Sequence, residues 1–182
     1  MKSIFNSEVK SWIFSIVFAI VLAFLVKFYI FAPFIVEGAS MEPTLHNEEK
    51  LLVNKTIGFT GSIKQGDIVI IQDNQADKHY VKRVIGLPGE KVEMKNDSLY
   101  IDDKKVKEPY LKESLAAAKK LGVNFTNDFG PVQVPKDQYF VMGDNRINSK
   151  DSRNGLGLIN KADIIGKSMF VVFPLNEARA TK

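Results

Sequence analysis

Apolar residues are concentrated in one continuous run near the start of the chain. Residues 11–36 read SWIFSIVFAIVLAFLVKFYIFAPFIV and carry a single charge, Lys27. About 20 helical residues, at a rise of roughly 1.5 Å each, span the ~30 Å hydrocarbon core of a bilayer. Lys27 lies near one end, so its ammonium can reach the lipid headgroups, and Trp12 and Tyr29 suit the two interfaces. The pattern predicts a transmembrane anchor helix over residues 11–36.

Two other interpretations of this run explain less of it. Nothing in the charge-balanced remainder of the chain needs so apolar a helix in a soluble core. A cleaved secretory signal has an apolar region of about 7–15 residues, which is shorter than this run. Lys2, Lys10 and the α-amine precede the run, so the positive-inside rule places residues 1–10 in the cytoplasm and residues 37–182 outside. We expect a single-pass protein of the cell membrane.

After residue 36 the pattern changes to short β-type runs separated by turn residues. The runs are Leu51–Asn54, Asp67–Ile71, Tyr80–Ile85, Lys91–Met94, Ser98–Ile101, Tyr139–Met142 and Ser168–Phe173. Leu87-Pro88-Gly89-Glu90 suits a type II turn, and residues 98–106 suit a hairpin. Residues 109–121 contain helix formers and end at Gly122, a suitable C-cap. We predict a mostly β fold: an antiparallel sheet domain over residues 37–182 with a small inserted β/helical subdomain.

Composition excludes several kinds of site and partner. The 182 residues are 45% hydrophobic and 25% charged, as in a folded domain. There is no cysteine, and the two histidines, His46 and His79, are far apart, so we expect no disulfide, metal or other cofactor. Residues 1–36 hold three lysines and one glutamate, which leaves only +2 of the total charge of +4 for the rest. That balance offers no surface for nucleic acid.

Three polar segments are unusual for a plain β-domain. Ser40 lies in the segment Gly38–Leu45, directly after the apolar run. Lys82 lies in a β-type run, where alternation places it on the same face as Tyr80 and Val84. Residues 142–155 are dense in charged residues, serine and asparagine. Each segment alone is compatible with a loop or a surface strand, but together they suit a hydrolase.

A serine and a lysine can form a hydrolytic pair when the lysine is neutral. At the ordinary pKa of ~10.4, only about 0.04% of a lysine is neutral at pH 7. Burial beneath apolar side chains lowers that pKa, and the strand neighbours of Lys82 could provide such burial. The backbone amide of Ser40 could donate to the oxyanion that forms during acyl transfer.

With these segments in this order, the sequence resembles type I signal peptidases of the short form with one N-terminal anchor. The resemblance covers nearly the whole chain. After the anchor it rests on Ser40–Leu45, Gly66–Val69, Tyr80–Glu90, Gly143–Arg146 and Ser149–Arg153. Any one of these motifs is weak, whereas their shared order and spacing are specific.

The resemblance implies a role for each motif. Ser40 would be the nucleophile and Lys82 the general base, with Ser149 hydrogen-bonded to the lysine amine. Asp144, Asp151 and Arg153 would support the site, and Met41, Pro43, Tyr80 and Val81 would line the substrate site. A variable insertion is expected over about residues 96–134. Some members carry a serine where this chain has Gly38, so a second oxyanion donor is not identified.

The resemblance also implies the substrate. Family members are serine endopeptidases that remove N-terminal signal peptides from secretory precursors after a small-x-small motif. An extended peptide that pairs with a strand edge presents alternate side chains to shallow pockets, which agrees with that motif. The expected partners are therefore signal peptides and the lipid bilayer, and the sequence leaves the oligomeric state open.

Three other functions compete with this one. An anchored β-domain that only binds exported chains would not need both Ser40 and Lys82. A Ser-His-Asp hydrolase would need His46 or His79, but His46 is close to Ser40 in sequence and no Gly-x-Ser-x-Gly motif occurs. A self-cleaving regulator with Ser/Lys chemistry would need a DNA-binding module, and none fits beside the anchor.

Overall fold

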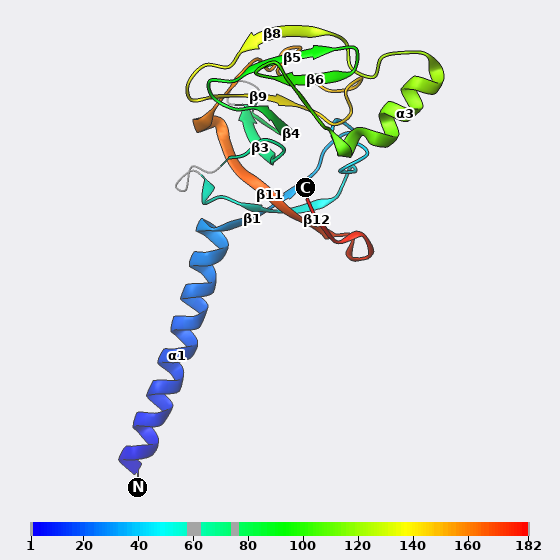
Figure 1. Cartoon of the computed structure of the whole chain (residues 1–182). Helices are drawn as coiled ribbons and strands as arrows, with labels where there is room; N and C mark the ends of the chain where they lie inside the picture. The colour runs from blue at the N-terminus through cyan, green and yellow to red at the C-terminus, as the bar shows by residue number, and fades with distance from the viewer. Residues whose placement is uncertain (1, 58–62, 74–76, 182) are drawn as a thin grey trace.

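A long helix projects from a β-domain (Figure 1). The computed structural model describes residues 2–57, 63–73 and 77–181. Helix α1 comprises Lys2–Tyr29. Within it, Glu8–Lys27 has a mean hydropathy of 2.4, and none of this span is buried against the rest of the protein. A helix this apolar and this exposed is long enough to cross a membrane.

The helix ends earlier than the apolar run does. We expected residues 11–36 to be helical, but Phe31–Ile35 forms strand β1, which pairs antiparallel with β2 (Lys50–Asn54). Pro33 explains the change, because proline lacks the amide proton that a helix interior requires and disfavours helical geometry in the preceding residue. Proline is tolerated here because β1 is an edge strand of its sheet.

The larger sheet has eight antiparallel strands among the described residues. Their order is β1-β2-β11-β3-β4-β9-β10, with β12 paired to β11. The further bounds are Ile68–Asp73 for β3, Lys78–Gly86 for β4, Gln138–Met142 for β9, Ile159–Asn160 for β10, Ile164–Phe173 for β11 and Arg179–Ala180 for β12. Two 3-10 turns, η2 (Lys161–Asp163) and η3 (Leu175–Glu177), lie at the two ends of β11.

The smaller sheet and a helix form the inserted part. Its strand order is β7-β6-β5-β8. The bounds are Lys91–Lys95 for β5, Ser98–Ile101 for β6, Lys104–Val106 for β7 and Phe129–Gln133 for β8, and the turn η1 (Pro109–Leu111) leads into helix α3 (Lys112–Leu121). Helix α3 ends at Gly122 with a left-handed φ of 69°. The sheet begins at Lys91, earlier than the expected insertion. The mostly β, antiparallel fold class is confirmed.

Strand β4 separates the apolar cores and therefore fixes the position of its charged residues. Val84 packs in a cluster on one side of the strand. Ile85 faces a cluster shared with the smaller sheet, and Val81 packs against the cluster that contains Met41 and Leu45. Alternate residues of β4 thus point to different cores, as the sequence pattern predicted. Lys82 and Arg83 lie between these cores and are buried with them.

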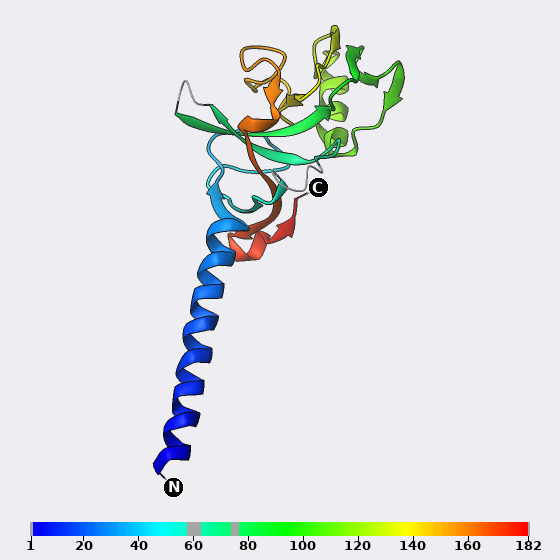
Figure 2. The same ribbon diagram turned by 90° about the vertical axis from the view of Figure 1, so that its left-hand side faces the viewer.

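One face of the larger sheet remains apolar and exposed beside α1. The register aligns Pro33, Leu52 and Phe170 across β1, β2 and β11. Phe170 is 43% exposed and Leu175, in the adjacent turn η3, is 80% exposed. Figures 1 and 2 together show that η3 and the end of β11 lie at the same end of the domain as α1 but to one side of it, whereas the smaller sheet lies at the opposite end.

Candidate active site

Lys82 and Ser40 lie in direct contact although 42 residues separate them in sequence. The Nζ of Lys82 is 2.6 Å from the Oγ of Ser40. The same nitrogen donates to the carbonyl of Val81 at 3.0 Å. Lys82 is only 2% exposed, and the ring of Tyr80 lies beside its Nζ. Strand β4 therefore delivers a buried amine to a partly exposed hydroxyl.

The surroundings of Lys82 favour its neutral form. Burial lowers its pKa from 10.5 to about 8, although the charges of Asp151 and Asp144 act to raise it, and Arg153 adds to the lowering. At a pKa of about 8, about a tenth of the amine is neutral at pH 7, several hundred times more than for a lysine in water. The amine can therefore accept the proton of the serine hydroxyl.

The turn that carries Ser40 is compact and anchored in the core. The amide of Glu42 donates to the carbonyl of Ala39 at 3.2 Å, and the amide of Leu45 donates to the carbonyl of Met41 at 3.0 Å. The Met41 and Leu45 side chains are buried. The side chain of Met41 therefore packs in the core, so the role in the substrate site expected for Met41 stays a prediction that only its backbone could fulfil. Pro43, Tyr80 and Val81 keep accessible surface.

Asn145 holds the backbone on both sides of the Ser40 amide. Its own amide donates to the carbonyl of Ser40 at 3.1 Å, and its Nδ2 donates to the carbonyl of Ala39 at 3.1 Å. The sequence placed Asn145 in the polar segment but assigned it no contact. A serine whose backbone is held in this way can keep its hydroxyl and its amide in fixed positions.

Asp144 is buried and forms a two-pronged ion pair with Arg83. Arg83 donates from Nε and Nη2 to the two carboxylate oxygens at 2.9 and 2.7 Å, and from Nη1 to the carbonyl of Gly66 at 2.8 Å. The hydroxyl of Thr44 donates to the same carboxylate. Sequence reasoning gave Arg83 no role. The signal available was a charged residue in the middle of an otherwise apolar strand.

A second ion pair joins Asp151, which is buried, to Arg153, which is partly buried. Arg153 donates to Asp151 from Nε at 2.9 Å and from Nη2 at 2.8 Å, and the amide of Gly143 donates at 3.0 Å. Burial acts to raise the pKa of Asp151, but the hydrogen bonds and charge of Arg153 outweigh it, so that pKa is lowered. The carboxylate stays charged and fixes the loop of Gly143.

The expected hydrogen bond between Ser149 and Lys82 is not formed. Ser149 is 6% exposed, and within the described residues its hydroxyl is directed to Asp151, where it helps to lower the pKa of that carboxyl, rather than to the lysine. The lysine nitrogen is directed to Val81 and Ser40 instead. Ser149 packs against Gly143, where any Cβ would overlap both Ser149 and the carbonyl of Ser40. Ser149 thus contributes shape close to the nucleophile rather than a contact with the amine.

Gly38 stands where backbone geometry favours glycine. Its φ of +83° is strained for other residues, and no atom lies within 4 Å of the position a Cβ would take. Its amide donates to Oδ1 of Asn47 at 2.8 Å. Gly38 therefore supplies no side-chain donor toward an oxyanion, as its identity already implied.

Both histidines have contacts elsewhere. The Nδ1 of His46 is 4.0 Å from a carboxylate oxygen of Glu42, and the ring of His79 packs edge-on against Phe34 with 5.5 Å between centroids. In the part of the chain that the structure describes, no cluster of three potential metal ligands occurs. The side chain that contacts the Ser40 hydroxyl is the Lys82 amine and not an imidazole.

Comparison with known proteins identifies the family of this chain. The model of the family described as signal peptidase, peptidase S26, matches residues 9–173. The chain belongs to the S26 family of signal peptidases. The resemblance found in the sequence is thereby confirmed, and so is the expected enzyme class, a serine peptidase.

Similar proteins cover nearly the whole chain. Signal peptidase I T of Bacillus subtilis is 59% identical over 171 residues, which are 94% of this chain and 89% of that protein. Signal peptidase I S of the same organism is 56% identical over 185 residues, covering all of both chains. A crystal structure of a signal peptidase I from Enterococcus faecalis is 36% identical with a TM-score of 0.51, covering 58% of this chain and 96% of that one.

Proposed function

We propose that this signal peptidase cleaves exported precursors after a small-x-small motif, with Ser40 as nucleophile and Lys82 as general base. The observation that carries the proposal is the 2.6 Å separation between the serine oxygen and the lysine nitrogen. The pKa of about 8 for Lys82 supports it, because a base must be neutral near its working pH.

The chemistry follows from these two groups. Neutral Lys82 accepts the hydroxyl proton while Oγ of Ser40 attacks the scissile carbonyl, and the Ser40 amide donates to the resulting oxyanion. The lysine ammonium then gives its proton to the leaving amine, which leaves an acyl ester on Ser40. A water molecule, deprotonated by the same amine, hydrolyses the ester and restores both groups. Asp144, Asp151 and Arg153 act through position, because they hold the loop that contacts the serine backbone.

Two strand edges could receive an extended substrate. Strand β9 pairs with Arg83–Gly86 of β4, so within the described residues the stretch Tyr80–Lys82 has a strand partner only on its β3 side. Strand β1 is also an edge, and its Phe34 contacts His79 of β4. A peptide that pairs along these edges would present alternate side chains to Tyr80 and Val81. Contact at alternate positions agrees with a motif that is restricted at alternate positions.

The proposed setting is a cell membrane, with residues 1–10 cytoplasmic and the catalytic domain outside. Helix α1 is apolar and exposed over Glu8–Lys27. The exposed apolar face of β1, β2 and β11 adjoins the end of that helix, where an interface would lie. Lys50 lies over the Phe173 ring on this face, a pairing of cation and aromatic ring suited to headgroups.

The test uses the full-length protein in detergent with a precursor that carries Ala-x-Ala. We expect one cut after the second alanine, identified by mass spectrometry of both products. Ser40→Ala should abolish the cut and keep the fold, since a partly exposed hydroxyl adds little stability. Binding without cleavage by the unmodified protein would instead favour a domain that only binds exported chains.

A further inference from the structure

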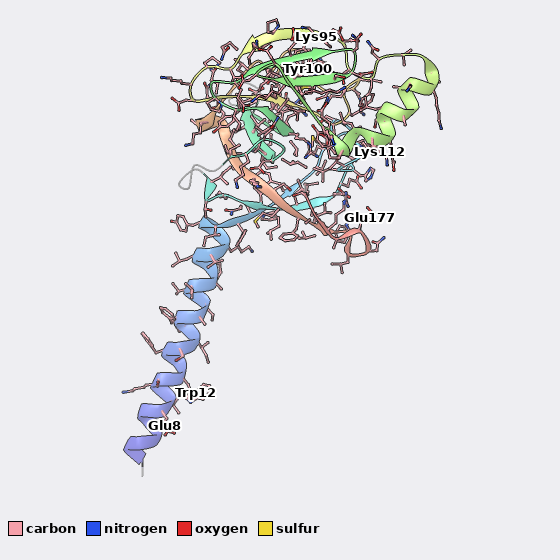
Figure 3. All side chains as sticks on the ribbon, in the orientation of Figure 1. Glu8, Trp12, Lys95, Tyr100, Lys112 and Glu177 are labelled. Atoms are coloured by element: carbon pink, nitrogen blue, oxygen red, sulfur yellow. The ribbon has the colours of Figure 1, made fainter. Side chains whose placement is uncertain are left out.

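The last residues of the described chain return to the turn that carries Ser40. After β11, turn η3 reverses the chain, and β12 pairs with β11 so that Arg179 lies opposite Val171. Figure 3 labels Glu177 in this turn, on the same end of the domain as α1. The family match ends at residue 173, so Arg179 lies beyond it.

Arg179 bridges two groups that are distant in sequence. Its Nη2 donates to the carbonyl of Thr44 at 2.8 Å and to Oε2 of Glu49 at 3.1 Å. Its Nη1 lies 2.8 Å from Oε1 of Glu49 in an ion pair. A planar guanidinium can satisfy a carboxylate and a carbonyl together, because its donors lie in a fixed fork.

Glu49 makes this bridge more than a surface contact. It is 2% exposed, and its Oε2 also accepts the amide of His46 at 3.1 Å. Its backbone carbonyl accepts the amide of Val36, which precedes the Ser40 turn, at 2.9 Å. A buried carboxylate is costly without a cation, so Arg179 and Glu49 stabilise each other at the base of the turn.

Thr44 is therefore held at two points. Arg179 binds its carbonyl, and its hydroxyl donates to Asp144, the residue paired with Arg83. Thr44 lies four positions after Ser40 in a turn closed by the hydrogen bond from Leu45 to Met41. A shift of Thr44 would move the turn and change the distance between Ser40 and Lys82.

We propose that Arg179 is a positioning residue for catalysis, acting through the Thr44 carbonyl to keep Ser40 within reach of Lys82. This inference rests on the proposed function of Ser40 and Lys82. The side-chain hydrogen bonds of Arg179 go to Glu177, Thr44 and Glu49 and not to the proposed substrate edge, so we expect its loss to change turnover more than substrate binding. A displacement of about 1 Å at a reacting group can cost on the order of a hundredfold in rate.

The experiment measures kcat and KM of Arg179→Met in the full-length protein with the Ala-x-Ala precursor. We expect kcat to fall about 10- to 100-fold with KM within about threefold, because the proposed substrate edges belong to β1 and β4. Added guanidinium should restore at least part of the lost rate. The matched control is Lys95→Met, which removes an exposed cation paired with Glu93 in the distant sheet and should leave kcat unchanged.

Arg179→Lys separates positioning from charge balance and remains informative if Arg179→Met does not fold. The ammonium can neutralise Glu49, but its shorter stem and compact charge do not reproduce the fork on Thr44. We expect thermal stability close to wild type and kcat at least about fivefold lower. Wild-type kcat in Arg179→Lys, or in folded Arg179→Met, overturns the proposal. Ser40→Ala is measured beside them, because cleavage retained by that variant would overturn the proposed function instead.

Discussion

Lys82 and Arg83 are adjacent basic residues on β4, but only Arg83 has a carboxylate as its direct hydrogen-bond partner. Arg83 meets the carboxylate of Asp144 in a two-pronged pair and is 1% exposed, so its charge is fully matched. Lys82 is equally buried but has a hydroxyl and a carbonyl as its hydrogen-bond partners, and its pKa falls to about 8. The same strand thus carries Arg83, whose charge is stabilised by an ion pair, and Lys82, whose neutral form is favoured by burial.

The difference arises from the alternation of the strand. Successive side chains point to opposite faces, so adjacent residues enter different surroundings. Arg83 faces the ring of Tyr110, 3.9 Å from its guanidinium carbon, and the inserted part of the domain. Lys82 faces the turn of Ser40. A lysine can therefore lie beside an ion-paired arginine without a direct contact to the carboxylate of Asp144, although the charge of Asp144 still acts to raise its pKa.

Substitution of Lys82 by arginine should give the largest effect. Arginine keeps the charge and much of the length, but it cannot deprotonate in this pH range. We expect kcat/KM to fall about a thousandfold or more, as far as in Lys82→Ala, measured on protein whose circular dichroism is unchanged. A kcat/KM of Lys82→Arg within about tenfold of wild type would show that Lys82, like Arg83, is not needed in a neutral form.

Loss of Arg83 should affect stability more than any other change on this strand. Arg83→Met leaves Asp144 buried without its cation, which typically costs about 3–5 kcal/mol. Denaturant unfolding should show this loss, with activity lost alongside it as the loop loses its support. The control is Lys82→Met, which should be at least as stable as wild type at pH 7. An equal loss of unfolding free energy in Arg83→Met and Lys82→Met would contradict the view that only Arg83 stabilises the fold through its charge.

The pH dependence of the free energy of unfolding should separate Lys82 from Arg83 further. The folded pKa of Lys82, about 8, lies below its unfolded value near 10.5, so folding opposes its charge. At about 1.4 kcal/mol per pKa unit, the penalty is about 3 kcal/mol below pH 8 and disappears as the pH rises toward 10.5. We expect Lys82→Met to be stabilised relative to wild type at pH 7, with the difference shrinking by pH 10. Activity of wild type should rise with pH through about 8.

Replacement of both histidines should have the smallest effect. His46→Gln with His79→Gln removes every imidazole, and a Ser/Lys site does not require one. We expect kcat/KM within about tenfold of wild type and the same rise with pH. A lost rise in a folded double variant would assign the titration to a histidine instead of Lys82.

Sequence reasoning identified the strands well and the end of the anchor poorly. The expected run Tyr80–Ile85 lies within β4, because alternation and β-branched residues carry a local signal. Phe31–Ile35 continues the apolar run, and composition alone does not separate a membrane span from an exposed edge strand. Pro33 was the one local indication, and only the pairing with β2 makes it decisive.

The site shows the same division between local and non-local information. The resemblance pointed to Ser40 and Lys82, which the structure brings together. The hydrogen bonds of Asn145 and Arg179 to the Ser40 turn were not foreseen, because such contacts join segments more than 100 residues apart. Ser149 was assigned to Lys82 by analogy, and the structure packs it against Gly143 instead.

A single residue, Ile30, separates helix α1 from strand β1. Its amide donates to the carbonyl of Val26 in α1 at 3.0 Å, and its carbonyl accepts the amide of Lys55, directly after β2, at 2.8 Å. Ile30 is therefore hydrogen-bonded both to the helix and to the β-domain. A one-residue junction held by two backbone hydrogen bonds is more restricted than a flexible linker. In the proposed membrane setting, Ser40 would then stand at one height above the bilayer, and depth itself would select which bond of an embedded precursor is cut.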